Sequence, residues 1–285
     1  MRNRKAKAEY NGAAHSASDS EFSLISNQKL LALYTGLLTC RRQATSANGT
    51  SASICGHEAA LVGATIDLGP GDAVCSREHG VVTGLSDGIM IPALLLHPGI
   101  HAPAAPGNGT AAYQADRNGS SLSAAGLAYL HAAIGKALAN KTISNRKVAV
   151  VFAPKEASEM LREALHIATV HALPMVFVHQ PEAHGDKARG KPRTSNQNHA
   201  RIKTPWFPSI TVDCHDVVAL YRVAFEAISR ARLGRGPTLI ECRPYRLKNR
   251  IHADDPVLHM EHYLRAKGLL DSGLNKDGFL ELNER

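Results

Sequence analysis

The stretch K-V-A-V-V-F, at residues 147–152, decides the fold class of this chain. After Lys147 it is continuously apolar, and it is shorter than an ordinary helix. Two comparable runs follow, P-M-V-F-V-H at residues 174–179 and T-L-I-E-C at residues 238–242. Short apolar runs of this kind predict strands that are buried on both faces, which is typical of parallel sheets.

Helical segments surround these strands. The residue pattern favours helices over residues 124–140, 156–171 and 217–232, the last of them capped by Asp216. Strands that alternate with helices predict the α/β class, with a doubly wound, mainly parallel sheet. In such sheets ligands bind beyond the carboxyl ends of the strands, so we expect a functional site at that edge.

Two further helices are predicted nearer the N-terminus. An i, i+3, i+4, i+7 apolar stripe favours a helix over residues 28–42, with Asn27 as a candidate cap. Residues 56–66 form a second helical candidate, whose small side chains suit close packing. Residues 97–121 hold several Pro and Gly clusters and predict a long surface loop.

Composition limits the class of protein. The chain has 285 residues, of which 44% are hydrophobic and 20% charged, so we expect one domain over residues 26–285 after a disordered basic and polar arm over residues 1–25. No apolar run is long enough to cross a membrane, and no secretory signal is visible, which favours a cytoplasmic protein. The five cysteines form no C-x-x-C pair and indicate reduced thiols.

The net charge of +8 raises the question of an anionic partner. Basic residues gather at the N-terminus and in residues 186–203, but no aromatic platform accompanies them, so nucleic-acid binding is not expected. The basic stretch is interpreted either as a solvated loop or as a face for an anionic ligand or partner.

Seven segments, in order along the chain, resemble one known family. They are G-H-E-A-A-L-V-G-A-T-I-D-L-G-P-G-D (56–72), R-E-H-G (77–80), E-A-L-H-I-A-T-V-H-A-L-P-M-V-F-V (163–178), V-D-C-H-D-V (212–217), A-R-L-G-R-G-P-T-L-I-E (231–241), Y-R-L-K-N-R-I-H-A-D-D-P (245–256) and the closing helix H-Y-L-R-A-K-G-L-L (262–270). They are similar to segments of the alpha subunit of thiamine-diphosphate-dependent 2-oxo acid dehydrogenase decarboxylase components, of the pyruvate, acetoin and branched-chain type. In that family the fourth segment reads V-D-G-N-D-V.

The resemblance implies a thiamine-diphosphate-binding fold and an oxidoreductase activity. An alpha subunit of this family acts with a beta subunit in a heterotetramer, in oxidative decarboxylation of a 2-oxo acid such as pyruvate. Thiamine diphosphate and Mg²⁺ bind at the interface of the two subunits, and the glutamate that activates the cofactor comes from the beta subunit. The resemblance therefore gives Glu58 no role as general base.

Five residues of this chain fall at family positions near the cofactor. Arg77 matches an arginine that contacts the diphosphate, although a surface arginine is the alternative interpretation, and His79 falls at a position for acid–base chemistry. Glu182 replaces an asparagine that binds the metal and is the remaining candidate metal ligand, and His184 replaces a tyrosine whose backbone carbonyl is used. Arg250 replaces a histidine near the diphosphate, where it is either a phosphate donor or a loop arginine.

The cofactor motifs themselves are altered. Counting back from Pro174, the family's G-D-G falls on Phe152, Ala153 and Pro154, which provide neither a carboxylate nor a glycine for close backbone approach. We therefore expect weak or absent binding of thiamine diphosphate with Mg²⁺. Two hypotheses follow: an enzyme subunit that acts with a beta partner, or a catalytically inactive paralogue that retains the fold and the partner-binding surface.

Overall fold

The computed structural model of the protein describes residues 25–46, 57–76, 80–83, 128–153, 158–179, 207–243 and 255–270. Its elements are α1 (Asn27–Ser46), α2 (Glu58–Thr65), β1 (Ala73–Ser76), β2 (Gly80–Thr83), α4 (Ala128–Thr142), β3 (Ala149–Ala153), α5 (Ser158–Val170), β4 (Met175–His179), β5 (Ser209–Asp213), α6 (Val217–Arg232), β6 (Thr238–Arg243) and α7 (Pro256–Ala266). Residues 1–24 of the predicted N-terminal arm, the predicted loop over 97–121 and the basic stretch over 186–203 lie outside these residues. Ile25, predicted as the last residue of that arm, is instead buried in the core.

Within the described residues, six strands form one sheet in the order β2-β1-β3-β4-β6-β5. β2 pairs with β1 in antiparallel fashion, and every other neighbouring pair is parallel. The predicted α/β class with a mainly parallel sheet is therefore confirmed. The three predicted strands are also confirmed: they are β3, β4 and β6, each with bounds within two residues of the prediction.

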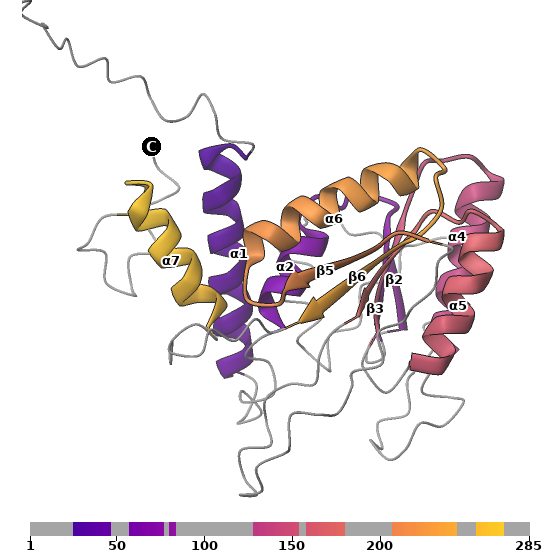
Figure 1. Cartoon of the computed structure of the whole chain (residues 1–285), viewed down its shortest axis with the longest axis horizontal. Helices are drawn as coiled ribbons and strands as arrows, with labels where there is room; N and C mark the ends of the chain where they lie inside the picture. The colour runs from indigo at the N-terminus through magenta and orange to yellow at the C-terminus, as the bar shows by residue number, and fades with distance from the viewer. Residues whose placement is uncertain are drawn as a thin grey trace, which may run out of the picture.

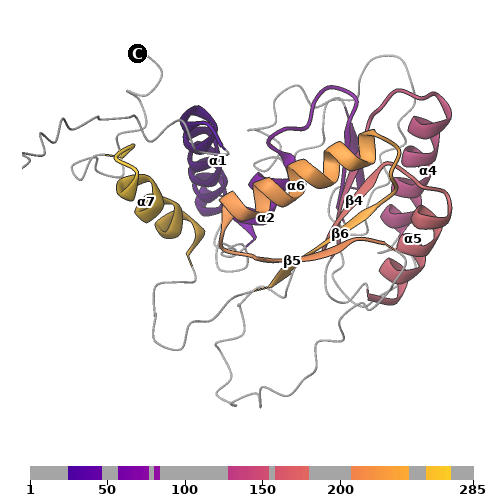
Figure 2. The same ribbon diagram turned by 45° about the horizontal axis from the view of Figure 1, so that its top comes forward.

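Helices cover both faces of the sheet (Figure 1; Figure 2). On one side α6 packs on the strands, α2 packs against α6 and α1, and α7 packs against α1; these helices share an apolar core with Val150 and Val176 of the sheet. α4 and α5 pack on the other face, where Val151 and Phe177 belong to a second core. Because successive residues of a strand point to opposite faces, a continuously apolar strand supplies both cores at once.

α2 is the innermost of the described helices. All eight of its residues are buried, and it packs against both α1 and α6. A Cβ atom added at Gly63 would stand 2.9 Å from the Cβ of Leu220 and 2.9 Å from the backbone nitrogen of Tyr221. The predicted small-residue face is thus where α2 and α6 make close backbone contact.

Two local predictions need correction. The hydroxyl of Ser26 accepts from the backbone N–H of Lys29 at 3.2 Å, so Ser26 occupies the place expected for Asn27, which is the first residue of α1. The closing helix covers 256–266 instead of 262–270, because Asp255 caps it, Pro256 opens it, and Gly268 ends it at a φ of +67°. By contrast, Asp216 caps α6 as predicted, and accepts from the backbone N–H groups of Val218 and Ala219.

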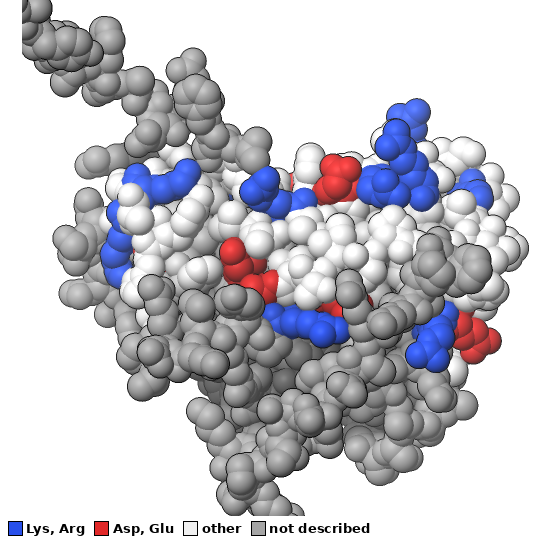
Figure 3. All heavy atoms as spheres, viewed as in Figure 1, with Lys and Arg blue, Asp and Glu red and all other residues white. Residues whose placement is uncertain are grey.

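The remaining general predictions concern membranes, thiols and charge. None of the described helices is long and apolar enough to cross a membrane. Among the described residues, Cys40, Cys75, Cys214 and Cys242 are buried free thiols, as predicted for these four. On the face shown in Figure 3, Lys and Arg side chains form separate groups interspersed with Asp and Glu.

Candidate functional site

The carboxyl ends of five parallel strands define the candidate site. β1, β3, β4, β6 and β5 end at Ser76, Ala153, His179, Arg243 and Asp213, in this order across the sheet. We call this the carboxyl edge. The segments that directly follow β1, β3, β4 and β6 lie outside the described residues, whereas the turn from β5 to α6 is described.

All five residues predicted for the cofactor site lie outside the described residues. They are Arg77, His79, Glu182, His184 and Arg250. Arg77 directly follows the last residue of β1, and Glu182 comes three residues after the last residue of β4. The strands that precede them thus end at the same edge of the sheet, and the roles of these residues stay predictions.

The residues at the end of β3 show whether this part of the chain could hold the Mg²⁺ of the expected cofactor. Ala153 continues the parallel ladder, opposite His179 of β4, and its side chain is fully buried in the core beneath α4 and α5. Phe152 is also buried, and its carbonyl accepts a hydrogen bond from the hydroxyl of Tyr129 at 3.2 Å. Neither residue offers a side-chain oxygen to Mg²⁺, which prefers several oxygen ligands. The residues present at this point therefore do not fit a magnesium diphosphate.

A three-residue ion cluster joins helices near the carboxyl edge. Arg41 of α1 donates from Nε to Oε1 of Glu58 at 2.9 Å and from Nη2 to Oε2 at 2.6 Å. Its Nη1 donates to the two carboxylate oxygens of Asp255 at 2.9 and 2.8 Å. Glu58 begins α2 and Asp255 caps α7, so one guanidinium fixes the starts of two helices against α1.

Both oxygens of Glu58 are occupied by Arg41, and the Glu58 side chain is only 1% exposed. Burial raises the pKa of the Glu58 carboxyl, and the hydrogen bonds and charge of Arg41 act in the opposite direction. A general base needs an oxygen that faces the substrate. Glu58 is therefore a structural ion-pair partner, in agreement with the sequence interpretation that gave it no catalytic role.

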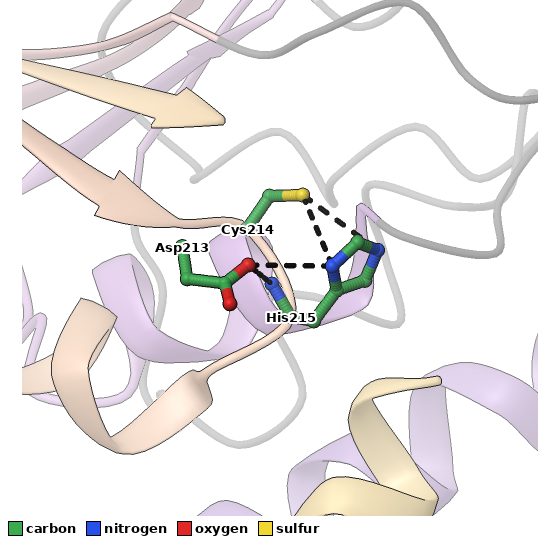
Figure 4. Close-up of side chains that lie close together, drawn as sticks. All are labelled: Asp213, Cys214 and His215. Carbon is green, nitrogen blue, oxygen red and sulfur yellow. Dashed lines mark hydrogen bonds and ion pairs between the residues drawn. The ribbon is translucent and has the colours of Figure 1, made fainter. Parts of the chain in front are cut away.

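The β5–α6 turn gathers a carboxylate, a thiol and an imidazole (Figure 4). The Sγ atom of Cys214 lies 3.6 Å from Nδ1 of His215, and this same Nδ1 lies 3.3 Å from Oδ1 of Asp213. Oδ1 of Asp213 also accepts from the backbone N–H of His215 at 3.1 Å. Cys214 and His215 are 2% and 5% exposed.

The electrostatics of this turn favour a charged imidazole. Burial alone would lower the pKa of His215, but hydrogen bonds to Asp213 and Cys214 and their charges raise it to about 10. Sequence reasoning matched V-D-C-H-D-V to a family motif without assigning it a role. The sequence feature that could have indicated this cluster is the presence of Cys214 and His215 where the family has Gly and Asn.

A nucleophilic relay does not fit this arrangement. In such a relay the base contacts the nucleophile through one ring nitrogen and its orienting carboxylate through the other. Here the shortest sulfur contact and the carboxylate contact involve the same nitrogen, Nδ1 of His215. The thiol of Cys214 is also almost completely buried.

Comparison with known proteins gives consistent findings. A family model described as "Dehydrogenase E1 component" matches residues 37–264. The chain is 34% identical over 201 residues to the alpha subunit of acetoin:2,6-dichlorophenolindophenol oxidoreductase from Bacillus subtilis, covering 67% of this chain and 59% of that protein. It is 29% identical over 228 residues to the Cupriavidus necator protein of the same name, covering 78% of this chain and 67% of that one.

A third relative carries a different substrate name. The chain is 37% identical over 131 residues to the alpha subunit of 3-methyl-2-oxobutanoate dehydrogenase from Mycobacterium tuberculosis, covering 45% of this chain and 35% of that protein. This chain thus spans about three fifths of the length of the Bacillus subtilis relative and a smaller share of the Mycobacterium tuberculosis one.

Proposed function

The chain belongs to the dehydrogenase E1 component family, and on this premise we propose that it acts as an alpha-type subunit in a 2-oxo acid dehydrogenase assembly. Its sheet is then the thiamine-diphosphate-binding fold, its partner is a beta subunit, and the complete assembly is a heterotetramer. The reaction of that assembly is oxidative decarboxylation of a 2-oxo acid such as pyruvate, in a family that depends on thiamine diphosphate.

The observation that carries this proposal is the extent of the family match over the described fold. The matched residues begin within α1 and end within α7, so they include the whole described sheet. The relatives are named as alpha subunits of acetoin and 3-methyl-2-oxobutanoate enzymes, which supports an alpha-type role.

A second candidate function is favoured by the end of β3. Ala153 is a buried ladder residue without a ligand atom, at the position matched to the magnesium-binding aspartate. A subunit with this residue loses one ligand of the cofactor's cation while it keeps the fold. We therefore propose, as the alternative, a catalytically inactive paralogue that retains the assembly surface.

Co-expression with a beta subunit from the same organism tests the alpha-type role. We expect the two chains to purify together and to elute as one heterotetramer, measured by size-exclusion chromatography with light scattering. The alpha subunit of the Bacillus subtilis acetoin enzyme with its own beta subunit is the positive control. Elution of the chain alone, without any beta subunit, would contradict the proposal.

The activity of the purified assembly separates the two candidates. Pyruvate, acetoin and 3-methyl-2-oxobutanoate are supplied with thiamine diphosphate and Mg²⁺, and reduction of 2,6-dichlorophenolindophenol is followed. Turnover by the assembly supports the catalytic subunit. An assembly without turnover, beside an active control, supports the inactive paralogue.

A further inference from the structure

The β5–α6 turn has a ligand set that the family's function does not use. The family sequence V-D-G-N-D-V is V-D-C-H-D-V here, so a thiol and an imidazole replace a glycine and an amide at 214 and 215. Together with Asp213 they place three potential ligand atoms within 4.8 Å of one another. Cys and His are the side chains that zinc ions prefer.

We propose that Asp213, Cys214 and His215 form a zinc-binding site at the start of α6 (Figure 4). Tetrahedral zinc has bonds of about 2.3 Å to sulfur and about 2.0–2.1 Å to nitrogen and oxygen. Tetrahedral angles then place sulfur and nitrogen about 3.5 Å apart, and nitrogen and oxygen about 3.3 Å apart.

Two of the three ligand pairs already have this spacing. Sγ of Cys214 and Nδ1 of His215 are 3.6 Å apart, and Nδ1 of His215 and Oδ1 of Asp213 are 3.3 Å apart. A zinc ion would replace these two contacts with coordinate bonds at nearly unchanged separations, and it would draw in the ligand atoms of Cys214 and Asp213, which lie within 4.8 Å of each other. The backbone N–H of His215, which donates to Oδ1 of Asp213, holds this carboxylate oxygen in place.

Charge and burial also suit a zinc ion. A divalent cation bound by a thiolate, a carboxylate and a neutral imidazole is formally neutral, so the buried site carries no net charge. Cys214 and His215 are almost completely buried, whereas the side chain of Asp213 is 32% exposed. Asp216 occupies the N–H groups at the start of α6, which would otherwise repel a cation.

Two neighbouring groups bear on this ligand set. Cys242 of the neighbouring strand β6 lies near enough that Cys214 and Asp213 add to the effect of burial in raising the pKa of its thiol. Glu58 is held by Arg41 through both oxygens, so it is not a ligand. A set that contains a thiol and an imidazole favours zinc over hard cations such as Mg²⁺ and Ca²⁺.

The test compares zinc binding by the full chain and by a variant with the family's own residues. The double variant Cys214→Gly/His215→Asn recreates V-D-G-N-D-V, a sequence that this fold accommodates, and circular dichroism verifies its folding. Cys75→Ala, a buried thiol of β1 in the opposite core, controls for the loss of a thiol in general. Each protein is stripped with a chelator, exposed to Zn²⁺, dialysed, and analysed for metal by mass spectrometry.

We expect the double variant to retain one zinc ion per chain fewer than the unaltered protein, and Cys75→Ala to retain the same number as the unaltered protein. The difference in zinc content between the unaltered protein and the double variant excludes zinc bound by other histidines, because both proteins contain those histidines. The single substitutions Cys214→Ala and His215→Ala should each weaken zinc binding by more than the roughly 10–100-fold that outer partners of a metal site contribute. Co²⁺ in place of Zn²⁺ should show thiolate charge-transfer absorption that Cys214→Ala abolishes. Equal zinc content in the unaltered protein and the folded double variant would overturn the proposal.

Discussion

Ala153, the last residue of β3, stands directly opposite His179, the last residue of β4, in a parallel register that begins at Ala149 and Met175. The ladder thus continues to the carboxyl edge, where the family resemblance expects a metal-binding aspartate. A fully buried alanine at this point leaves the strand intact and removes a ligand. The parallel ladder therefore reaches the carboxyl edge in this chain without an oxygen ligand at this position.

Substitution of Ala153 by aspartate tests whether the side chain at this position is buried away from solvent and cations. The side chain lies in the core beneath α4 and α5, so Ala153→Asp buries a carboxylate without a partner. We expect a loss of about 3–5 kcal/mol in the free energy of unfolding, measured by urea denaturation at neutral pH. Ala153→Ser, which adds no charge, should cost clearly less. An Ala153→Asp variant as stable as the unaltered chain would show that the end of β3 opens to solvent or to a cation.

The Arg41–Glu58 pair should be strongly coupled. Arg41→Met leaves the buried carboxylate of Glu58 without its partner, and we expect a loss of about 3–5 kcal/mol in stability. Adding Glu58→Gln removes that charge and should recover part of the loss. A double-mutant cycle by urea denaturation provides the coupling energy. Strictly additive effects of the two substitutions would argue against the pair.

Acid should weaken the cluster through Asp255. Burial alone would raise the pKa of the Asp255 carboxyl, but hydrogen bonds and charge from Arg41 and the N–H groups of Leu258 and Val257 lower it. A carboxyl whose pKa is lower when folded stabilises the protein above its unfolded pKa of about 3.9, and this contribution is lost as the pH falls through the folded pKa.

Asp255→Asn keeps a capping side chain and removes the charge. We expect it to destabilise the protein by about 1–2 kcal/mol at pH 7 and by progressively less below about pH 4, in urea titrations at a series of pH values. Glu226→Gln, at an exposed carboxylate of α6, is the control. A difference between Asp255→Asn and the unaltered chain that stays constant down to pH 3 would contradict this assignment.

Two helical glycines provide a matched pair for the packing of α2. Gly63→Ala places a methyl group against the backbone of α6, and we expect a loss of about 1–3 kcal/mol in stability. Gly135→Ala in α4 meets nothing within 4 Å and should stabilise the protein by about 0.5–1 kcal/mol through helix propensity. Thermal unfolding of both variants checks this. Equal effects of the two would show that α2 and α6 are not in close contact.

The sequence predicts the centre of this fold better than its borders. β3, β4 and β6 are continuously apolar because both faces are covered, so their pattern is recognisable. β1 has only four residues, and the first three residues of the edge strand β5 are exposed, so neither shows a long apolar run. The strand order depends on contacts between distant segments, which a local pattern does not contain.

In the candidate site, too, local features can be predicted from the sequence, whereas contacts between distant segments cannot. The Asp216 cap follows from a local rule, since a side-chain acceptor directly precedes a helical pattern. The contact of Arg41 with Asp255 spans 214 positions and becomes visible only when α1 and α7 pack together. Cys214 and His215 depart visibly from the family motif, but the turn that follows β5 is what brings their ligand atoms and that of Asp213 within 4.8 Å of one another.

The most direct test of the central claim is a calorimetric titration of thiamine diphosphate, with and without Mg²⁺, into the chain assembled with a beta subunit. In our proposal this chain keeps the alpha-subunit fold but lacks the family aspartate that holds the cofactor's cation, since Ala153 stands at its position. Loss of one charged ligand costs about 2–5 kcal/mol, so we expect binding roughly 30- to several-thousand-fold weaker than in the Bacillus subtilis acetoin-type assembly. Magnesium-dependent binding as tight as in that control would contradict the account.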